Sequence, residues 1–368
     1  MNTTNINSPT LLLNKEQVLK NIETMAIKAK KHHLIFRPHF KTHQSAEIGN
    51  WFKDVGVDKI TVSSVGMANY FAHAGWKDIT IAFPLNVREL NDIENLAKKI
   101  KLNVLINSLE TMQYMVKNGT QNIGYFIKID TGYHRAGILA ENVEQIQQII
   151  ETAEQNKNLY FKGFLAHFGH TYHANNQSDI LKIFETGRTK LANLKEHFIH
   201  QYPNMLISIG DTPSCTLANN FSGIDEIRPG NLVFFDLMQS SIGICHEKDI
   251  AVAVVCPVVD KYPERGEVII YGGAVHFSKE YVVDKHGNKI FGKIAQLSQN
   301  GWTEMETKIY LSSLSQEHGV IKAPKSFINS LKIGDLLAVL PVHSCLTANL
   351  LKEYLLLDGE KIKMWRNC

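Results

Sequence analysis

The stretch KEQVLKNIETMAIKAKKHHLIFRPHF (15–40) contains the alternation from which the fold of this chain can be predicted. Its first part (15–31) has the apolar spacing of an amphipathic helix, and LIFRPHF (34–40) is a short β-rich run. The same succession of helix and strand continues to about residue 235. It predicts eight strands, at 34–40, 58–64, 78–83, 102–107, 124–130, 160–168, 205–210 and 224–230.

Strands that alternate with helices form parallel βαβ units. Eight such units in about 220 residues match the size of a (β/α)8 TIM-like barrel. An open doubly wound sheet is the alternative. No G-x-G-x-x-G follows the first strand, which disfavours a dinucleotide-binding sheet. We therefore predict an α/β protein whose main domain is a (β/α)8 barrel.

The pattern changes after about residue 245, where strand-like runs are separated by turn residues with little helical periodicity. A mainly β C-terminal domain should follow the barrel, and SPTLLLN (8–14) could add a strand to it. The predicted division is 1–14 for this strand, 15–245 for the barrel and 246–368 for the β domain. The strand-like runs of the last part are 251–262, 266–277, 306–314, 335–343 and 353–365.

The composition indicates a protein that acts on a small molecule. Lysine and arginine exceed aspartate and glutamate by only three, 39 against 36, so neither nucleic acid nor a membrane surface is expected as a partner. Five scattered cysteines and a start without a secretory pattern predict a cytoplasmic protein with reduced thiols. No apolar run approaches the roughly 20 residues of a transmembrane helix.

The predicted first strand leads into RPHFKTH (37–43), which carries a candidate nucleophile. Because side chains alternate along a strand, Arg37, His39 and Lys41 should share the face that points into the barrel. Barrel enzymes carry their catalytic groups at this end of the strands. A lone lysine there more often simply reaches solvent. Burial and neighbouring positive charge would instead lower the pKa of Lys41 and suit it to Schiff-base chemistry.

Two later strand ends combine into a candidate anion site. SIGDTPSCTLAN (208–219) enters a helix through a tight turn, and EIRPGN (226–231) follows the eighth strand. Backbone N–H groups at the helix N-terminus and the hydroxyls of Thr212 and Ser214 suit an anion, although each turn alone could be ordinary helix capping. Loops after strands seven and eight form the usual phosphate site of such barrels. A phosphate-bearing cofactor opposite Lys41 is therefore indicated.

Other polar residues follow strands five and six and the late strand-like run at 335–343. Arg135 in DTGYHRAGI (130–138) could hold an anionic oxygen, and His167 could stack on an aromatic ring or be an ordinary satisfied histidine. The spacing in GHTYH fits no standard metal site. His343 and Cys345 in PVHSCLTANL (341–350) are too few for a structural zinc site, and strand-end packing alone would explain them.

Together these motifs resemble those of the fold-type III pyridoxal-phosphate enzymes, the alanine racemase-like barrels, and in particular their D-threonine aldolase and D-serine dehydratase branch. They follow in family order and cover nearly the whole chain. The resemblance implies that Lys41 holds pyridoxal 5'-phosphate as a Schiff base and removes the substrate's α-proton. It matches Arg228 to the racemase arginine that faces the pyridine nitrogen. The implied cofactor contacts besides Lys41 are Arg135, His167, Tyr172, Gly210, Thr212, Arg228, Gly230 and Asn231.

The same resemblance gives the pair at 343 and 345 a role. A His-x-Cys pair resembles the zinc ligands of the dehydratases, whereas the aldolases carry His-x-Asp and use harder ions such as manganese, as ligand softness would dictate. His343 and Cys345 would bind Zn2+ with positions left open for substrate. The resemblance thus implies a homodimeric D-serine dehydratase that acts on a small D-amino acid. The alternatives are a D-threonine aldolase, a 3-hydroxy-D-aspartate dehydratase, an amino-acid racemase and a non-catalytic pyridoxal-phosphate-binding protein.

Overall fold

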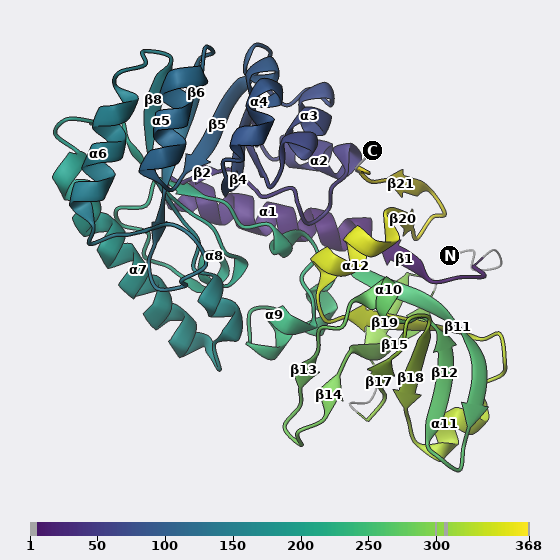
Figure 1. Cartoon of the computed structure of the whole chain (residues 1–368). Helices are drawn as coiled ribbons and strands as arrows, with labels where there is room; N and C mark the ends of the chain where they lie inside the picture. The colour runs from purple at the N-terminus through teal and green to yellow at the C-terminus, as the bar shows by residue number, and fades with distance from the viewer. Residues whose placement is uncertain (1–5, 299, 305–307, 367–368) are drawn as a thin grey trace.

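The computed structural model describes residues 6–298, 300–304 and 308–366 and contains two large β-sheets (Figure 1). All strands of the first sheet run parallel, and eight of them coincide with the predicted strands. A short ninth strand, β7 (Ile138–Leu139), pairs only with β6. The eight are β2 (Ile35–Phe36), β3 (Ile60–Val62), β4 (Asp78–Pro84), β5 (Lys101–Ile106), β6 (Ile123–Asp130), β8 (Leu159–Ala166), β9 (Leu206–Ile209) and β10 (Glu226–Ile227).

The first sheet curls into a barrel. Its order is β2-β10-β9-β8-β6-β5-β4-β3, and the chain beyond β2 meets β3 through a parallel bridge between His39 and Thr61. The N–H of Phe40 donates to the Thr61 carbonyl at 2.9 Å, and the N–H of Thr61 donates to the Pro38 carbonyl at 2.9 Å. The predicted barrel is confirmed, and its closing contact lies two residues before Lys41.

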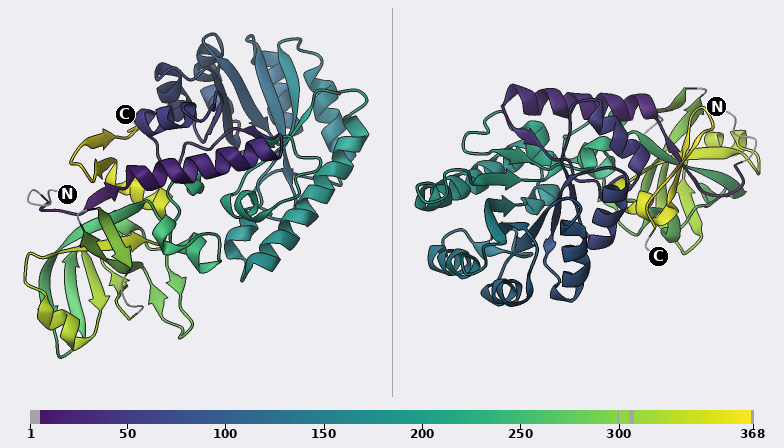
Figure 2. Two further views of the ribbon diagram at one scale, coloured as in Figure 1. Left: turned by 180° about the vertical axis from the view of Figure 1, so that it is seen from behind. Right: turned by 90° about the horizontal axis from the view of Figure 1, so that it is seen from above.

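Helices connect the strands and surround the barrel, as the view from above shows (Figure 2, right). The first helix begins where Asn14 caps it by accepting a hydrogen bond from the N–H of Gln17. Most of its apolar residues at helical spacing are buried, although Leu19 and Ile27 are exposed. The helices are α1 (Lys15–Lys31), α2 (Ala46–Lys53), α3 (Val65–His73), α4 (Leu90–Ala97), α5 (Leu109–Asn118), α6 (Val143–Ala153), α7 (Gln177–Phe198) and α8 (Thr212–Leu217).

The interior of the barrel contains one layer of apolar side chains and, elsewhere along the barrel axis, buried charged side chains. Leu105, Phe126 and Leu165 form a separate buried cluster there. Since strand residues alternate, Lys128 of β6 faces the same interior as Phe126, one step nearer the carboxyl end of the strand. Arg37 is buried in the same barrel and is discussed below with the site.

The second sheet is mainly antiparallel and contains ten strands among the described residues. The N-terminal strand β1 (Thr10–Leu13) lies within it, antiparallel to β11 and parallel to β20. The boundaries at 14/15 and 245/246 stay predictions. The other strands are β11 (Val252–Tyr262), β12 (Glu267–Tyr271), β15 (Gly292–Ser298), β16 (Gly301–Glu304), β17 (Tyr310–Leu314), β18 (His318–Lys322), β19 (Leu336–Pro341), β20 (Glu353–Leu356) and β21 (Lys361–Lys363).

One strand-like run of this half ends differently from the prediction. The run 266–277 contains β12 and then a helical turn, α10 (Ala274–Phe277), so its last part is not a strand. The helical turn follows the Gly272-Gly273 pair, at which a Cβ would lie 2.5 Å from the Cys256 Sγ and 2.3 Å from the Gln316 carbonyl oxygen, and Gly273 is its N-cap residue. The run 335–343 contains β19, and helix α12 (Ser344–Leu351) begins directly after it. Residues 306 and 307 of a third run, and Cys368, lie outside the described residues.

Shorter elements complete the chain: α9 (Leu237–Ser241), α11 (Lys325–Ser330), the hairpin of β13 (Val282–Val283) and β14 (Lys289–Ile290), and single turns of 3-10 helix. None of the helices in the described part of the chain combines the length and apolar character needed to cross a bilayer.

Candidate active site

Lys41 lies in a turn just beyond the contact that closes the barrel, with an exposed side chain. Its backbone N–H donates to Nδ1 of His39 at 3.4 Å. The neighbouring Phe40 is fully buried and packs against the rings of Phe71 and Trp76, with centroids 5.0 and 5.1 Å away. The turn that presents the amine is therefore anchored by an aromatic core on one side.

Arg37 does not join Lys41 at the site. Its guanidinium donates from Nε to Glu226 and from Nη1 to Asp78, both at 2.6 Å, and its side chain is 4% exposed. Only a continuous alternating strand would keep Arg37 beside Lys41, but the regular strand β2 ends at Phe36. The expectation that Arg37 faces the catalytic end is wrong, because the buried Glu226 and the partly exposed Asp78 hold it deeper in the barrel.

Three cationic side chains from different elements act on both His39 and His167. Burial is the largest cause that brings the pKa of both imidazoles well below its ordinary value, and Lys41, Arg135 and Arg228 lower both further. Lys128 adds to this effect on His167. A concentration of positive charge around two neutral imidazoles suits an anionic ligand.

His167 is held in one orientation at the end of β8. Its Nδ1 donates a hydrogen bond to the carbonyl oxygen of Gly210, which leaves Nε2 as the acceptor nitrogen of the neutral ring. The rings of Tyr133 and Tyr172 lie beside it, with centroids at 6.1 and 6.3 Å. Such a fixed flat ring can stack on an aromatic ligand.

The predicted phosphate turn is a helix N-terminus with unpaired hydroxyls. Asp211 caps α8 by accepting from the N–H of Ser214 at 2.7 Å. The Oγ1 of Thr212 and the Oγ of Ser214 are buried without a hydrogen-bond partner among the described residues. The N–H of Thr212 donates to the hydroxyl of Tyr172 at 3.2 Å. The free hydroxyls and the helix end form a cradle that a phosphate group would fill.

Two glycines bring the backbone close to this cradle. A Cβ at Gly210 would lie 3.0 Å from Nη1 of Arg228, and one at Gly230 would lie 2.6 Å from the carbonyl oxygen of His39. Gly230 therefore has no room for a side chain, and one at Gly210 would crowd Arg228. The loop after β10 is thereby packed against the turn that carries Lys41, and the loop after β9 lies against Arg228.

Arg228 and Asn231 are both fixed by protein groups. Arg228 is buried and donates to the Ser208 hydroxyl at 2.7 Å and the Ala166 carbonyl at 2.6 Å. Burial is the main reason that its pKa falls to about 10. Asn231 donates to Asp236 at 2.7 Å and to Sγ of Cys345 at 3.6 Å. Asn231 thus faces the sulfur at 345, which the sequence did not indicate.

Arg135 is exposed in the loop after β6. Its guanidinium lies 4.9 Å from the centre of the Tyr133 ring, within the range of a cation–π contact. Asp130 shapes the loop by accepting from the backbone N–H groups of Gly132, Tyr133 and His134 at 2.9 to 3.1 Å. These hydrogen bonds are among the reasons that the Asp130 pKa is low, although burial, the largest cause, opposes them.

His343 and Cys345 lie at the N-terminus of α12, where His343 is the N-cap residue. Thr42, the residue after Lys41, places its hydroxyl 3.3 Å from Sγ of Cys345. Burial raises the pKa of Cys345, but hydrogen bonding to His343, together with Lys41 and Thr42, outweighs it and lowers this pKa. Burial lowers the pKa of His343, but hydrogen bonds to Cys345 and Glu280 outweigh burial and raise this pKa to about 11. An imidazole and a low-pKa thiol suit a soft divalent cation such as zinc.

The described residues contain no group of three or more histidine, cysteine, aspartate or glutamate side chains that could hold a metal ion. A metal held by His343 and Cys345 would have two protein ligands, which is the open arrangement of a catalytic rather than a structural site.

Lys128 is a candidate site residue that sequence reasoning missed. Its side chain is 7% exposed, and its Nζ donates to the carbonyl oxygen of Ile129 at 2.9 Å. Burial, helped by Arg228 and Arg135, lowers its pKa to about 7. The signal was present in FIKID (126–130), where one lysine interrupts an apolar strand.

This burial predicts a pH dependence of stability. The native state releases the Lys128 proton near pH 7, whereas the unfolded chain keeps it to about pH 10.5. Unfolding takes up a proton in that window, so stability contributed by this group rises with pH. We compare the free energy of unfolding of the cofactor-free parent with that of Lys128→Met, measured by urea unfolding. We expect the difference in favour of the parent to grow by about 1 kcal/mol per pH unit across the window.

The comparison isolates Lys128 because other groups titrate equally in both proteins. Lys20→Met, at an exposed position of α1, should follow the parent at every pH. If the unfolding free energies of the parent and Lys128→Met changed with pH in the same way, the amine of Lys128 would not be buried and neutral.

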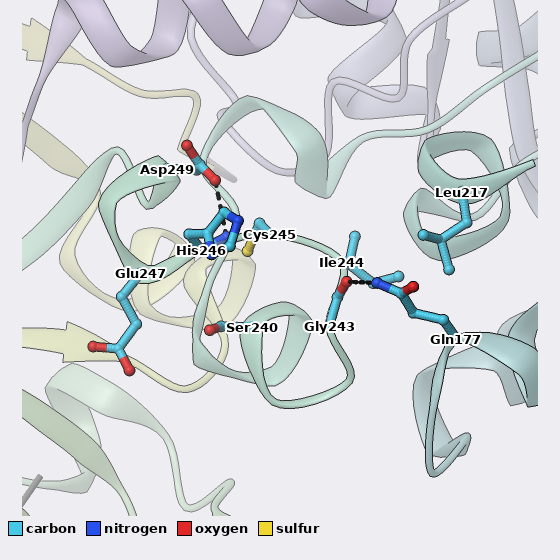
Figure 3. A pocket seen from close by; sticks show the side chains of 9 residues that line it. All are labelled: Gln177, Leu217, Ser240, Gly243, Ile244, Cys245, His246, Glu247 and Asp249. Carbon is cyan, nitrogen blue, oxygen red and sulfur yellow. Dashed lines mark hydrogen bonds between the residues drawn. The ribbon is translucent and has the colours of Figure 1, made fainter.

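A cavity of about 600 Å3 lies elsewhere, along the segment that joins the two domains (Figure 3). The Nε2 of Gln177 donates to the Gly243 carbonyl across it, and the N–H of His246 donates to Asp249. Its lining contains none of the predicted site residues. It is formed by Gln177, Leu217, Ser240, Gly243, Ile244, Cys245, His246, Glu247 and Asp249.

Comparison with known proteins assigns the chain to a family. The model of the alanine racemase N-terminal domain matches residues 13–237, and that of a serine dehydratase domain matches residues 251–357. The chain belongs to the alanine racemase-like, fold-type III pyridoxal-phosphate enzymes. Within this family it is 30% identical to D-serine dehydratase of Dictyostelium discoideum, over 97% of this chain and 94% of the relative.

Other members of the family have the same fold. D-threo-3-hydroxyaspartate dehydratase of a Delftia strain is 25% identical over 98% of this chain and 97% of its own. Its solved structures include a cysteine-to-alanine variant in a metal-free form, which superimposes with a TM-score of 0.91 at 24% identity over 99% of both chains. D-threonine aldolase of Filomicrobium marinum has a TM-score of 0.78 at 18% identity, covering 97% of this chain and 95% of that one.

Proposed function

We propose that this chain is a pyridoxal-phosphate- and zinc-dependent D-serine dehydratase, which converts D-serine to pyruvate and ammonia. The observation that carries the proposal is the adjacency of two groups. Lys41 and Thr42 are neighbours in the chain, and the Thr42 hydroxyl lies 3.3 Å from Sγ of Cys345. A base for the α-carbon and a thiol–imidazole pair for the β-hydroxyl thus belong to one site.

The residues present fit pyridoxal 5'-phosphate. Lys41 would attach the cofactor, the α8 N-terminus with Thr212, Gly210 and Gly230 would take its phosphate, and His167 would stack on its ring. Support comes from the buried hydroxyls without partners and from the cations gathered around His39 and His167. Tyr172, Arg135, Arg228 and Asn231 are proposed as the surrounding contacts. The bound cofactor would supply the electron sink that acidifies the α-proton.

The chain's own residues would then divide the work. The exposed amine of Lys41 would take the α-proton of the substrate. Neutral His167, whose orientation is held by the Gly210 carbonyl, would keep the cofactor ring in place. His343 and Cys345 would hold zinc, whose Lewis acidity stabilises a departing hydroxyl, a poor leaving group by itself.

The main alternative activity is that of a D-threonine aldolase, because an enzyme with that activity has the same fold. It is disfavoured by the sulfur ligand, since a thiolate selects zinc and a carboxylate selects manganese or magnesium. A dehydratase of D-threo-3-hydroxyaspartate differs only in substrate and stays the second candidate. We also propose a homodimer in the cytoplasm, in line with the family resemblance.

A product assay decides among these activities. We expect the zinc-loaded enzyme to release equal amounts of pyruvate and ammonia from D-serine, measured by coupled dehydrogenase assays. D-threonine and D-threo-3-hydroxyaspartate should be compared at the same concentrations. Formation of glycine and an aldehyde would overturn the proposal, as would a preference for D-threo-3-hydroxyaspartate.

A further inference from the structure

Glu280 makes a short contact with the proposed metal site. Its Oε2 lies 2.6 Å from Nδ1 of His343, and the two side chains are partly exposed. Glu280 comes from the loop between α10 and β13, a segment that the site has not otherwise used.

The fold holds this loop against the metal pair. Helices α10 and α12 pack together, and the Thr347 hydroxyl of α12 donates to the Phe277 carbonyl at the end of α10 at 3.5 Å. The chain then turns sharply at Ser278, whose φ of 71° is in the left-handed region, and the Ser278 hydroxyl accepts from the N–H of Glu280 at 3.3 Å. Glu280 therefore approaches His343 from a loop that is anchored at its first residues.

The hydrogen bond determines which nitrogen of His343 can bind a metal. A carboxylate only accepts, so Nδ1 carries a hydrogen and is committed to Glu280, which leaves Nε2 as the nitrogen that a metal ion could use after displacing its proton. His343 is also hydrogen-bonded to Cys345, and with Nδ1 occupied by Glu280 this contact falls to the Nε2 side of the ring. Nε2 thus faces the sulfur with which it would share a cation once a metal ion replaced the proton between them.

We propose that Glu280 is a positioning residue that fixes the orientation and tautomer of His343 and thereby raises the affinity of the site for zinc. The inference rests on the proposed function for the identity of the metal. Carboxylates that accept from the second nitrogen of a metal-binding histidine raise its basicity and commonly change metal affinity by about 10- to 100-fold. With only two protein ligands at this site, the contribution of each matters more.

The test is a zinc titration of the pyridoxal-phosphate-loaded, zinc-free protein in competition with a chelator. Glu280→Ala should weaken zinc binding by about 10- to 100-fold. Glu280→Gln should weaken it less, because the amide oxygen can still accept from Nδ1. The matched control is Glu317→Gln, in the same half of the chain, whose carboxylate lies 3.9 Å from the imidazole of His276. Its zinc affinity should equal that of the parent.

Cobalt substitution separates positioning from direct ligation. If Glu280 acts through His343, the thiolate-to-cobalt absorption and the coordination number reported by the spectrum should be the same in the parent and Glu280→Gln. Equal losses in the Gln and Ala variants with a changed cobalt spectrum would make Glu280 a ligand and overturn the inference. Unchanged zinc affinity in Glu280→Ala would also overturn it.

The outcome can be separated from that of the proposed function. The parent could bind zinc, with Glu280→Gln binding it more weakly and Glu280→Ala more weakly still, and yet form glycine and an aldehyde. That result would support the role of Glu280 and refute the dehydratase. A parent that binds no zinc would refute both the metal assignment and the role of Glu280.

Discussion

Lys41→Ala should lower turnover of D-serine by about a thousandfold or more and leave pyridoxal 5'-phosphate without a covalent bond to the protein. The reason is that the other lysine that lowers the His167 pKa is poorly placed to replace it. Lys128, the second lysine near His167, is buried, and its Nζ is bonded to the Ile129 carbonyl. The measurement is steady-state pyruvate formation together with the visible absorbance of the covalently bound cofactor.

Lys41→Arg provides the matched control for this prediction. It keeps the positive charge beside His39 and His167 but has no amine that can attack an aldehyde. Phosphate-driven binding of the cofactor should survive in both variants, as equilibrium dialysis would show. A covalent absorbance that persisted in Lys41→Ala would transfer the attachment to another lysine, with Lys128 the first to examine.

Cys345→Ala should lose zinc and with it elimination of the β-hydroxyl, by about two to three orders of magnitude in turnover. Removal of the α-proton depends on Lys41 rather than on the thiol. Exchange of the α-hydrogen of D-serine with deuterium from the solvent should therefore continue in this variant. Zinc content by mass spectrometry, pyruvate formation and hydrogen exchange by NMR give the three readouts.

The matched variant here is Cys345→Asp, which offers a harder ligand at the same place. We expect it to favour manganese over zinc, because a carboxylate suits the harder ion. Cys245→Ala, in the joining segment and outside the site, should keep zinc and activity. Turnover that survived complete removal of zinc from the parent would contradict the assigned role of the metal.

Most of the fold was predictable because its signals are local. Helical and strand periodicities repeat along residues 15–235, and all eight barrel strands occur at the predicted positions. The exception arose where packing overrides local pattern. Residues 274–277 are helical and directly follow Gly272 and Gly273, where the backbone lies against Cys256 and Gln316.

The candidate site was predictable only in part. Lys41, His167, Thr212 and Cys345 belong to compact motifs that each carry their own chemical signature. Asn231 was expected at the cofactor, yet its amide also donates to Asp236 and Cys345, which are 5 and 114 residues away. Such hydrogen bonds depend on how distant segments meet, and no local spacing reports them.

The sequence by itself determined that parallel strands alternate with helices, that a lysine follows the first of them, and that a histidine and a cysteine follow a late strand. These features depend on the periodicity and chemistry of neighbouring residues. Only the tertiary structure decided that Arg37 is paired with Asp78 and Glu226, that Lys128 is buried beside the site, and that Glu280 contacts His343. The reason is that barrel closure and the packing of α10 on α12 join residues far apart in the chain, and charge pairing and burial follow from those contacts.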